Sequence, residues 1–132
     1  MRRGFFAGQA GDLVLLWLAH GLLRVRPPLA AHAVMLRLGS LLPALDTPAD
    51  AGRLARSLRR HGSCLSRALA VAARTPAADV VFAVEPRQAA PLFAHAWVEI
   101  DGIPIDASDV AGTVIARLRG PRSKVGEMAA EK

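Results

Sequence analysis

The single cysteine is the residue whose chemistry stands out first in this sequence. Cys64 follows Ser63 at the predicted start of a helix over residues 64–74, where the serine side chain can cap the free backbone amides. Those amides and the helix dipole favour a thiolate, which makes Cys64 a candidate nucleophile. A lone cysteine is more often a small buried apolar residue, so the nucleophile interpretation needs a partner.

His95 is the candidate partner. It lies within a predicted strand over residues 93–100, between two alanines that leave its ring accessible. An imidazole at such a position can take a proton from a thiol and return it to a leaving group. Cys64 and His95 together therefore indicate nucleophilic catalysis.

A hairpin register supplies a third residue. Asp101-Gly102 is a strong signal for a two-residue type I′ turn, which pairs Ile100 with Ile103. Continuing that register makes Asp106 the diagonal neighbour of His95 on one face of the sheet. Asp109 would point the other way, and a slip of one residue would reverse the choice between the two aspartates. The sequence thus predicts a Cys-His-Asp triad of Cys64, His95 and Asp106.

Trp97 shares the predicted face of His95. It is a candidate substrate-binding residue that would wall a cleft beside the triad, and core packing is the equally good alternative. The backbone amide of Cys64 is one candidate donor for an oxyanion.

Helices followed by strands must position these residues. Apolar periodicity, prolines and caps predict helices over 11–24, 30–42, 49–60 and 64–74, and strands over 79–84, 93–100 and 103–108. This order predicts an α+β fold in which N-terminal helices pack on a small antiparallel sheet. We expect one compact domain, with an N-terminal helical region at 1–48, a catalytic core at 49–120 and a flexible tail at 121–132.

Two helices carry amphipathic patterns. Leu13, Leu16, Trp17 and His20 recur at helical spacing, which predicts a helix that faces the core or a partner. In the helix over 49–60, two leucines oppose a strip of arginines that we expect to be solvated. The leucines are Leu54 and Leu58, and the arginines are Arg53, Arg56, Arg59 and Arg60.

Composition excludes several classes of protein. The 132 residues are 52% hydrophobic with a net charge of +6, which is typical of a globular domain. The absence of tyrosine and an aromatic content of 5% argue against a nucleic-acid module. The apolar run at 13–18 is too short to span a membrane, and the arginines and prolines that follow it are unlike a signal peptide.

Cysteine and histidine usage bears on metals and on compartment. One cysteine excludes an internal disulfide framework, which favours a cytoplasmic location. The remaining histidines lack metal-ligand spacing, so we expect no metal and no cofactor.

Two segments in combination resemble a known family. Cys64-Leu-Ser-Arg-Ala-Leu-Ala and Phe93-Ala-His-Ala-Trp-Val-Glu-Ile-Asp-Gly102 closely resemble the leader peptidases of lasso-peptide biosynthesis. The resemblance implies a transglutaminase-like, papain-like core and a cysteine protease. It maps the nucleophile to Cys64 and the base to His95. It maps the acid less firmly to Asp106, because Asp109 is close by.

The resemblance also implies partners. Such a protease removes the leader peptide from a ribosomally made precursor, and an asparagine-synthetase-like cyclase then closes the macrolactam. The residues before Cys64 are predicted to be helical and lack the strands of a leader-binding domain. A separate leader-recognition protein is therefore the expected partner.

Two alternatives stay open. A transglutaminase-like acyltransferase would use the same triad and differ in the nucleophile that resolves the thioester. A non-catalytic scaffold would bind the leader or the cyclase without reacting.

Overall fold

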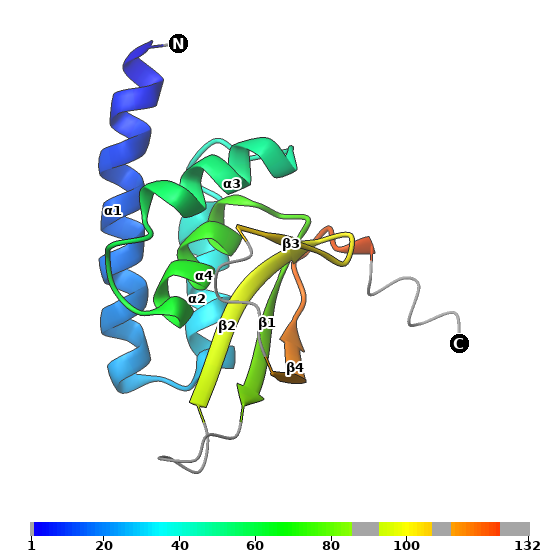
Figure 1. Ribbon diagram of the computed structural model, residues 1–132. Coiled ribbons are helices and arrows are strands. Elements are labelled where there is room, and N and C mark those ends of the chain that lie inside the picture. The colour runs from blue at the N-terminus through cyan, green and yellow to red at the C-terminus, as the bar shows by residue number, and fades with distance from the viewer. Residues whose placement is uncertain (1, 86–92, 107–111, 125–132) are drawn as a thin grey trace.

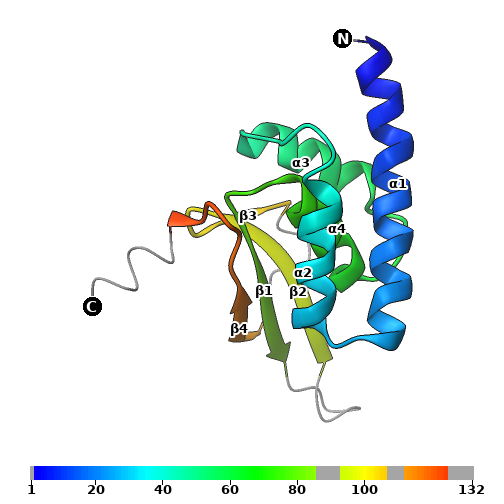
Figure 2. The ribbon, with the colours of Figure 1, turned by 180° about the vertical axis from the view of Figure 1, so that it is seen from behind.

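Four helices form one layer, and a four-stranded antiparallel sheet forms the other (Figures 1 and 2). The computed structural model describes residues 2–85, 93–106 and 112–124. The helices are α1 (Arg2–Val25), α2 (Pro28–Gly39), α3 (Pro48–Ser57) and α4 (Cys64–Arg74). The strands are β1 (Ala78–Glu85), β2 (Phe93–Ile100), β3 (Ile103–Ile105) and β4 (Thr113–Leu118), in the sheet order β3-β2-β1-β4. The predicted α+β class is confirmed.

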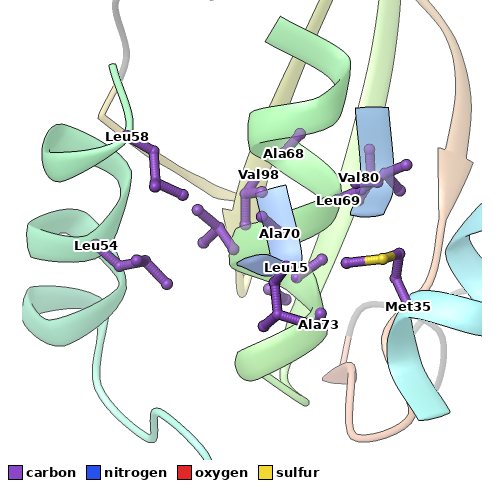
Figure 3. Packing of buried hydrophobic residues seen from close by; sticks show 14 of the residues in the cluster. Leu15, Met35, Leu54, Leu58, Ala68, Leu69, Ala70, Ala73, Val80 and Val98 are labelled. Atoms are coloured by element: carbon purple, nitrogen blue, oxygen red, sulfur yellow. The ribbon is translucent and has the colours of Figure 1, made fainter. Parts of the chain in front are cut away.

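Helix α4 lies at the centre of the core. Its residues from Ala68 to Ala73 are all buried, and they pack against the other helices and the inner face of the sheet (Figure 3). Leu54 of α3 and Leu58, which follows that helix, approach it from one side, and Met35 of α2 approaches from another. Small side chains along α4 let its neighbours come close, which is why an alanine-rich helix can occupy this position.

The hairpin between β2 and β3 has the predicted register. Ile100 pairs with Ile103 and Val98 with Ile105, across a turn in which Asp101 and Gly102 have φ angles of 53° and 79°. Positive φ at both turn positions is the geometry of a type I′ turn. The register prediction is therefore confirmed.

The third strand is shorter than predicted. β3 ends at Ile105, because Asp106 adopts a φ of 52° and leaves the extended conformation. The remainder of the predicted strand, and Asp109, lie outside the described residues.

Strand β4 was not predicted. It pairs antiparallel with β1, with Val81 opposite Arg117, and its residues are mostly exposed. The strand shows no alternation of buried and exposed positions, which is the signal that reveals a strand in a sequence. Its position depends on the free edge of β1, and that edge exists only once the sheet has formed.

Helix α1 starts earlier than predicted and buries a different stripe. It begins at Arg2 instead of residue 11, because isolated glycines in a helix cost only about 1 kcal/mol each and do not end it. Leu16 is fully buried, whereas Leu13 and Trp17 of the predicted stripe are 37% and 52% exposed. Among the described residues, no helix combines the length and apolar character needed to cross a bilayer.

Candidate active site

Cys64 is the first residue of α4, as predicted. Ser63 caps the helix: its hydroxyl accepts a hydrogen bond from the Ser66 backbone amide at 3.1 Å, and the Ser66 hydroxyl accepts one from the Ser63 amide at 2.8 Å. This reciprocal capping box fixes where the helix starts. The thiol is free and partly buried, at the helix end that stabilises negative charge.

A small pocket opens beside the thiol. Its volume is about 30 Å³, room for about one water molecule. The pocket lies where α3 and α4 meet β2 and the end of β3. It is lined by Ala55, Cys64, Arg67, Ala68, Val71, Ala96, Trp97, Val98, Ile105 and Asp106. The lining is mostly apolar, and its charged residues are Arg67 and Asp106.

Asp106 reaches this pocket through its backbone conformation. Its left-handed φ takes it out of the β3 ladder, and its Oδ1 accepts a hydrogen bond from Arg59 Nη2 at 2.5 Å. Arg59 follows α3 and is half exposed. Two members of the predicted solvated strip of arginines therefore pair with carboxylates: Arg59 with Asp106, and Arg53 with Asp50 on α3. The structure thus brings Asp106 and Cys64 together.

His95 lies on the other face of β2. It pairs with Ala83, which forms a separate buried cluster with Val81 and Trp97, while Ala96 and Val98 belong to the core around α4. The His95 Nε2 lies 3.8 Å from Glu85 Oε2. His95 is not among the residues that line the Cys64 pocket.

The hairpin register predicts His95 and Asp106 on one face of the sheet. The strand alternation on which this prediction depends ends at Ile105, because Asp106 has a positive φ.

Trp97 borders the pocket as part of β2, but its side chain lies on the opposite face of the sheet, in the cluster with Val81 and Ala83, and is held there by a carboxylate that sequence reasoning missed. Its indole Nε1 donates to Glu99 Oε2 at 2.9 Å, and Glu99 Oε1 accepts from Arg117 Nη1 at 2.6 Å. Glu99 is 6% exposed. The spacing of two residues along a strand could have placed Glu99 beside Trp97, but Arg117 belongs to the unpredicted β4.

Arg67 lies one helical turn after Cys64 and also lines the pocket. Its Nη1 donates to the carbonyl oxygens of His61 and Gly62 at 3.0 and 3.2 Å. Arg67 therefore fastens the turn before Ser63 to α4 and supports the position of Cys64.

A comparison with protein families decides the fold family. The profile of the transglutaminase-like superfamily matches residues 40–119. The chain belongs to the transglutaminase-like superfamily. Comparison with curated proteins found no significant match, and comparison with solved structures found none either.

The superfamily match bears on the chemistry expected of the cysteine at the pocket. The matched segment begins directly after α2 and includes α3, α4 and all four described strands. Members of the transglutaminase-like superfamily are often cysteine-dependent enzymes. Cys64 is the one cysteine in the chain, so a cysteine-dependent reaction in this transglutaminase-like core has a single candidate thiol.

Proposed function

We propose that this transglutaminase-like chain is a cysteine protease that removes the leader peptide from a ribosomally synthesised lasso-peptide precursor. The observation that carries the proposal is Cys64 at the capped N-terminus of α4, beside a pocket that Asp106 also lines. The resemblance of the Cys64 and His95 segments to leader peptidases supports the choice of substrate.

In the proposed reaction the Cys64 thiolate attacks the carbonyl carbon of the scissile peptide bond. The C–N bond breaks as His95 donates a proton to the leaving amine, and a thioester remains on Cys64. Water then attacks the thioester carbon while His95 takes its proton. The C–S bond breaks, the leader leaves with a free carboxylate, and the thiol is restored. Asp106 orients the imidazole and stabilises its charged form.

This mechanism requires the His95 side chain to change its position. Its imidazole must reach the Cys64 side of β2 in the reacting state, whereas its described contact is with Glu85 on the opposite face. The same geometry favours the non-catalytic scaffold as the second candidate. Reactivity of the Cys64 thiol separates the two, because a scaffold needs no activated thiol.

The proposal includes two partners. A separate leader-recognition protein would hold the precursor leader, and the resemblance of the Cys64 and His95 segments to leader peptidases supports this partner. Tethering the leader would raise its local concentration at the pocket to about the millimolar range. An asparagine-synthetase-like cyclase in the same cytoplasmic compartment would then close the macrolactam.

The test is product mass. Genes next to the one for this chain are searched for a short precursor, a cyclase and a leader-binding protein, and that precursor is incubated with the full chain and the leader-binding protein. A leader with a free carboxylate supports the protease. An adduct on the leader identifies an acyltransferase, and an intact precursor with an unreactive Cys64 identifies a scaffold.

Two histidine variants test the role of His95 in this cleavage. His95→Ala should stop cleavage and slow alkylation of Cys64 at neutral pH, because the proposed reacting state places the His95 imidazole beside the thiol as its base. His20→Ala, on α1, is the matched control and should leave both rates unchanged. Equal rates for the two variants would remove His95 from the mechanism.

A further inference from the structure

Three arginines lie around the Cys64 pocket, and two of them have partners. Arg59 pairs with Asp106, which lines the pocket. Arg67 lines the pocket itself, and its Nη1 donates to two backbone carbonyl oxygens. Arg56 differs from both: its side chain is exposed, and none of the described residues gives it a hydrogen bond or an ion pair. The charge of Arg56 is therefore open to a ligand.

The Arg56 guanidinium lies at the edge of the pocket. A Cβ added to Gly52 would lie 3.4 Å from Arg56 Nη1 and 3.8 Å from Ile105 Cγ2, so these two atoms cannot be further apart than the two distances combined. Ile105 is a buried residue of the pocket lining, and Ala55, the neighbour of Arg56 in α3, also lines the pocket. The Arg56 side chain thus folds back along α3 and brings its charge to the end of β3.

The carboxylates of this region are already engaged. Asp106 accepts from Arg59 at 2.5 Å, and Asp50 lies 3.4 Å from Arg53. Asp106 is the one carboxylate among the described residues that line the pocket. Arg56 therefore adds a positive charge at the pocket edge that no described carboxylate pairs with.

A guanidinium beside an apolar surface is suited to a carboxylate. Its planar N–H donors match the two oxygens of a carboxylate, whereas a side-chain amide offers one oxygen and no charge. The buried Ile105 side chain excludes water on one side, and opposite charges attract more strongly where water is excluded. A carboxylate that enters with a peptide would meet Arg56 without displacing an existing partner.

We propose that Arg56 binds the carboxylate of an aspartate or glutamate in the peptide on which Cys64 acts, close to the bond that is cleaved. The inference rests on the proposed function for the nature of the substrate, and it adds a specificity-determining residue to that site. Arg56 takes no part in making or breaking bonds. Its effect is to favour acidic peptides over their amide counterparts.

Two alkylating reagents of nearly equal size test the effect of the charge directly. Iodoacetate carries a carboxylate where iodoacetamide carries an amide, and in both reactions the Cys64 sulfur displaces iodide. Because the chain has one cysteine, mass spectrometry follows each rate at that thiol alone. The ratio of the iodoacetate rate to the iodoacetamide rate should be at least about threefold higher in the unchanged chain than in Arg56→Gln. Equal ratios would overturn the proposal.

Arg37→Gln is the matched control. It removes one positive charge from an exposed site on α2, and no residue of α2 is among those that line the pocket. This variant should keep the ratio of the unchanged chain, and a fall as large as in Arg56→Gln would assign the effect to net charge and overturn the proposal. Both side chains are exposed, so thermal unfolding should show that both variants fold.

Salt provides a second check on the same ratio. Sodium chloride at about 1 M should narrow the difference between the unchanged chain and Arg56→Gln, because salt screens exposed charges. A difference that salt leaves unchanged would mean that the shape of the side chain matters and its charge does not, which would overturn the proposal.

Peptidyl reagents test the substrate class. Chloroacetyl-alanyl-glutamate amide should alkylate Cys64 of the unchanged chain at least about threefold faster than its glutamine counterpart, and Arg56→Gln should react equally with both. Equal rates in the unchanged chain would overturn the assignment to a peptide carboxylate. Protection of the thiol by inorganic phosphate, without an advantage for the glutamate reagent, would assign the site to another anion and overturn it as well.

The alkylation rates separate this inference from the proposed protease activity, because they are measured without a precursor. Charge-selective alkylation by a chain that does not cleave its precursor would keep the carboxylate site and refute the protease. Cleavage by a chain whose alkylation is not charge-selective would keep the protease and refute the role of Arg56. A Cys64 thiol that reacts with none of the reagents would refute both.

Discussion

At the scale of single residues, Cys64 offers the sharpest prediction. Cys64→Ala should abolish leader cleavage and alkylation by iodoacetamide, because no other thiol is present. Alanine favours helices and the site is only partly buried, so the free energy of unfolding should change by no more than about 1 kcal/mol. Mass spectrometry and thermal unfolding give the two readouts. Cleavage by the variant at the original rate would end the protease hypothesis.

Asp106 should matter for turnover more than for stability. Its ion pair with Arg59 is half exposed on the arginine side, and such pairs contribute about 0–1 kcal/mol. Asp106→Ala should therefore lower single-turnover cleavage by about 100-fold or more while leaving some activity, since an orienting acid does not itself react.

Asp109→Ala is the matched comparison for Asp106, and it should cleave almost normally. A severe defect in Asp109→Ala beside normal turnover in Asp106→Ala would transfer the orienting role to Asp109. The confirmed pairing of Ile100 with Ile103 excludes a register slip in the turn as the reason for such a result.

Glu99 should hold the Trp97 indole in the buried cluster on the face of the sheet opposite the Cys64 pocket. Glu99→Ala leaves the buried indole N–H without its acceptor and removes the partner of Arg117, which should cost about 1–3 kcal/mol of unfolding free energy. Glu99→Gln keeps an acceptor oxygen and should cost less. Urea unfolding followed by tryptophan fluorescence measures both, and equal losses would mean that the charge alone matters.

At the scale of elements, the contact of α2 with α4 depends on a glycine. A Cβ on Gly39 would lie 1.8 Å from the Ala73 carbonyl oxygen and 2.9 Å from its Cβ, so the two helices would have to separate. Gly39→Ala should therefore destabilise the fold by about 1–3 kcal/mol. Gly21→Ala meets nothing within 4 Å and should stabilise α1 by about 0.5–1 kcal/mol. Opposite shifts in the urea midpoint are the expected result, and equal shifts would contradict the close packing.

At the scale of the whole molecule, a buried histidine makes stability depend on pH. His32 is 4% exposed, and its Nε2 has no hydrogen-bond partner among the described residues. Burial lowers the pKa of His32 below its ordinary value of 6.5, and the nearby Asp79 carboxylate only partly opposes that effect. The imidazole is therefore neutral in the core.

The sign of the pH effect follows from linkage. As the pH falls below 6.5, the unfolded chain binds a proton at His32 before the folded chain does, so stability is full above that pH and is lost below it. Urea unfolding at about pH 7.5 and about pH 5 should show the loss, and His32→Gln should reduce it. An unchanged difference in the variant would assign the pH effect to other groups.

Local physical chemistry determined much of this protein from the sequence alone. Ser63 marks the start of α4 because a hydroxyl satisfies amides a few residues away, and Asp101-Gly102 sets the β2–β3 register because few residues tolerate positive φ. The α+β class follows from the order of periodic segments. The position of Cys64 at a helix start was predictable for the same reason: each signal acts between neighbours in the chain.

Only the tertiary structure decided which residues from distant segments meet, at the pocket and elsewhere. β4 forms on the free edge of β1, and Arg117 on it reaches Glu99, although the two are 18 residues apart. The left-handed φ of Asp106 brings its carboxylate to Arg59 and the Cys64 pocket, while strand alternation places His95 with Ala83 on the opposite face. The exposed face of α1 likewise depends on which of its sides the core buries. These outcomes depend on contacts between distant segments, whose free energy exists only when the whole chain has packed.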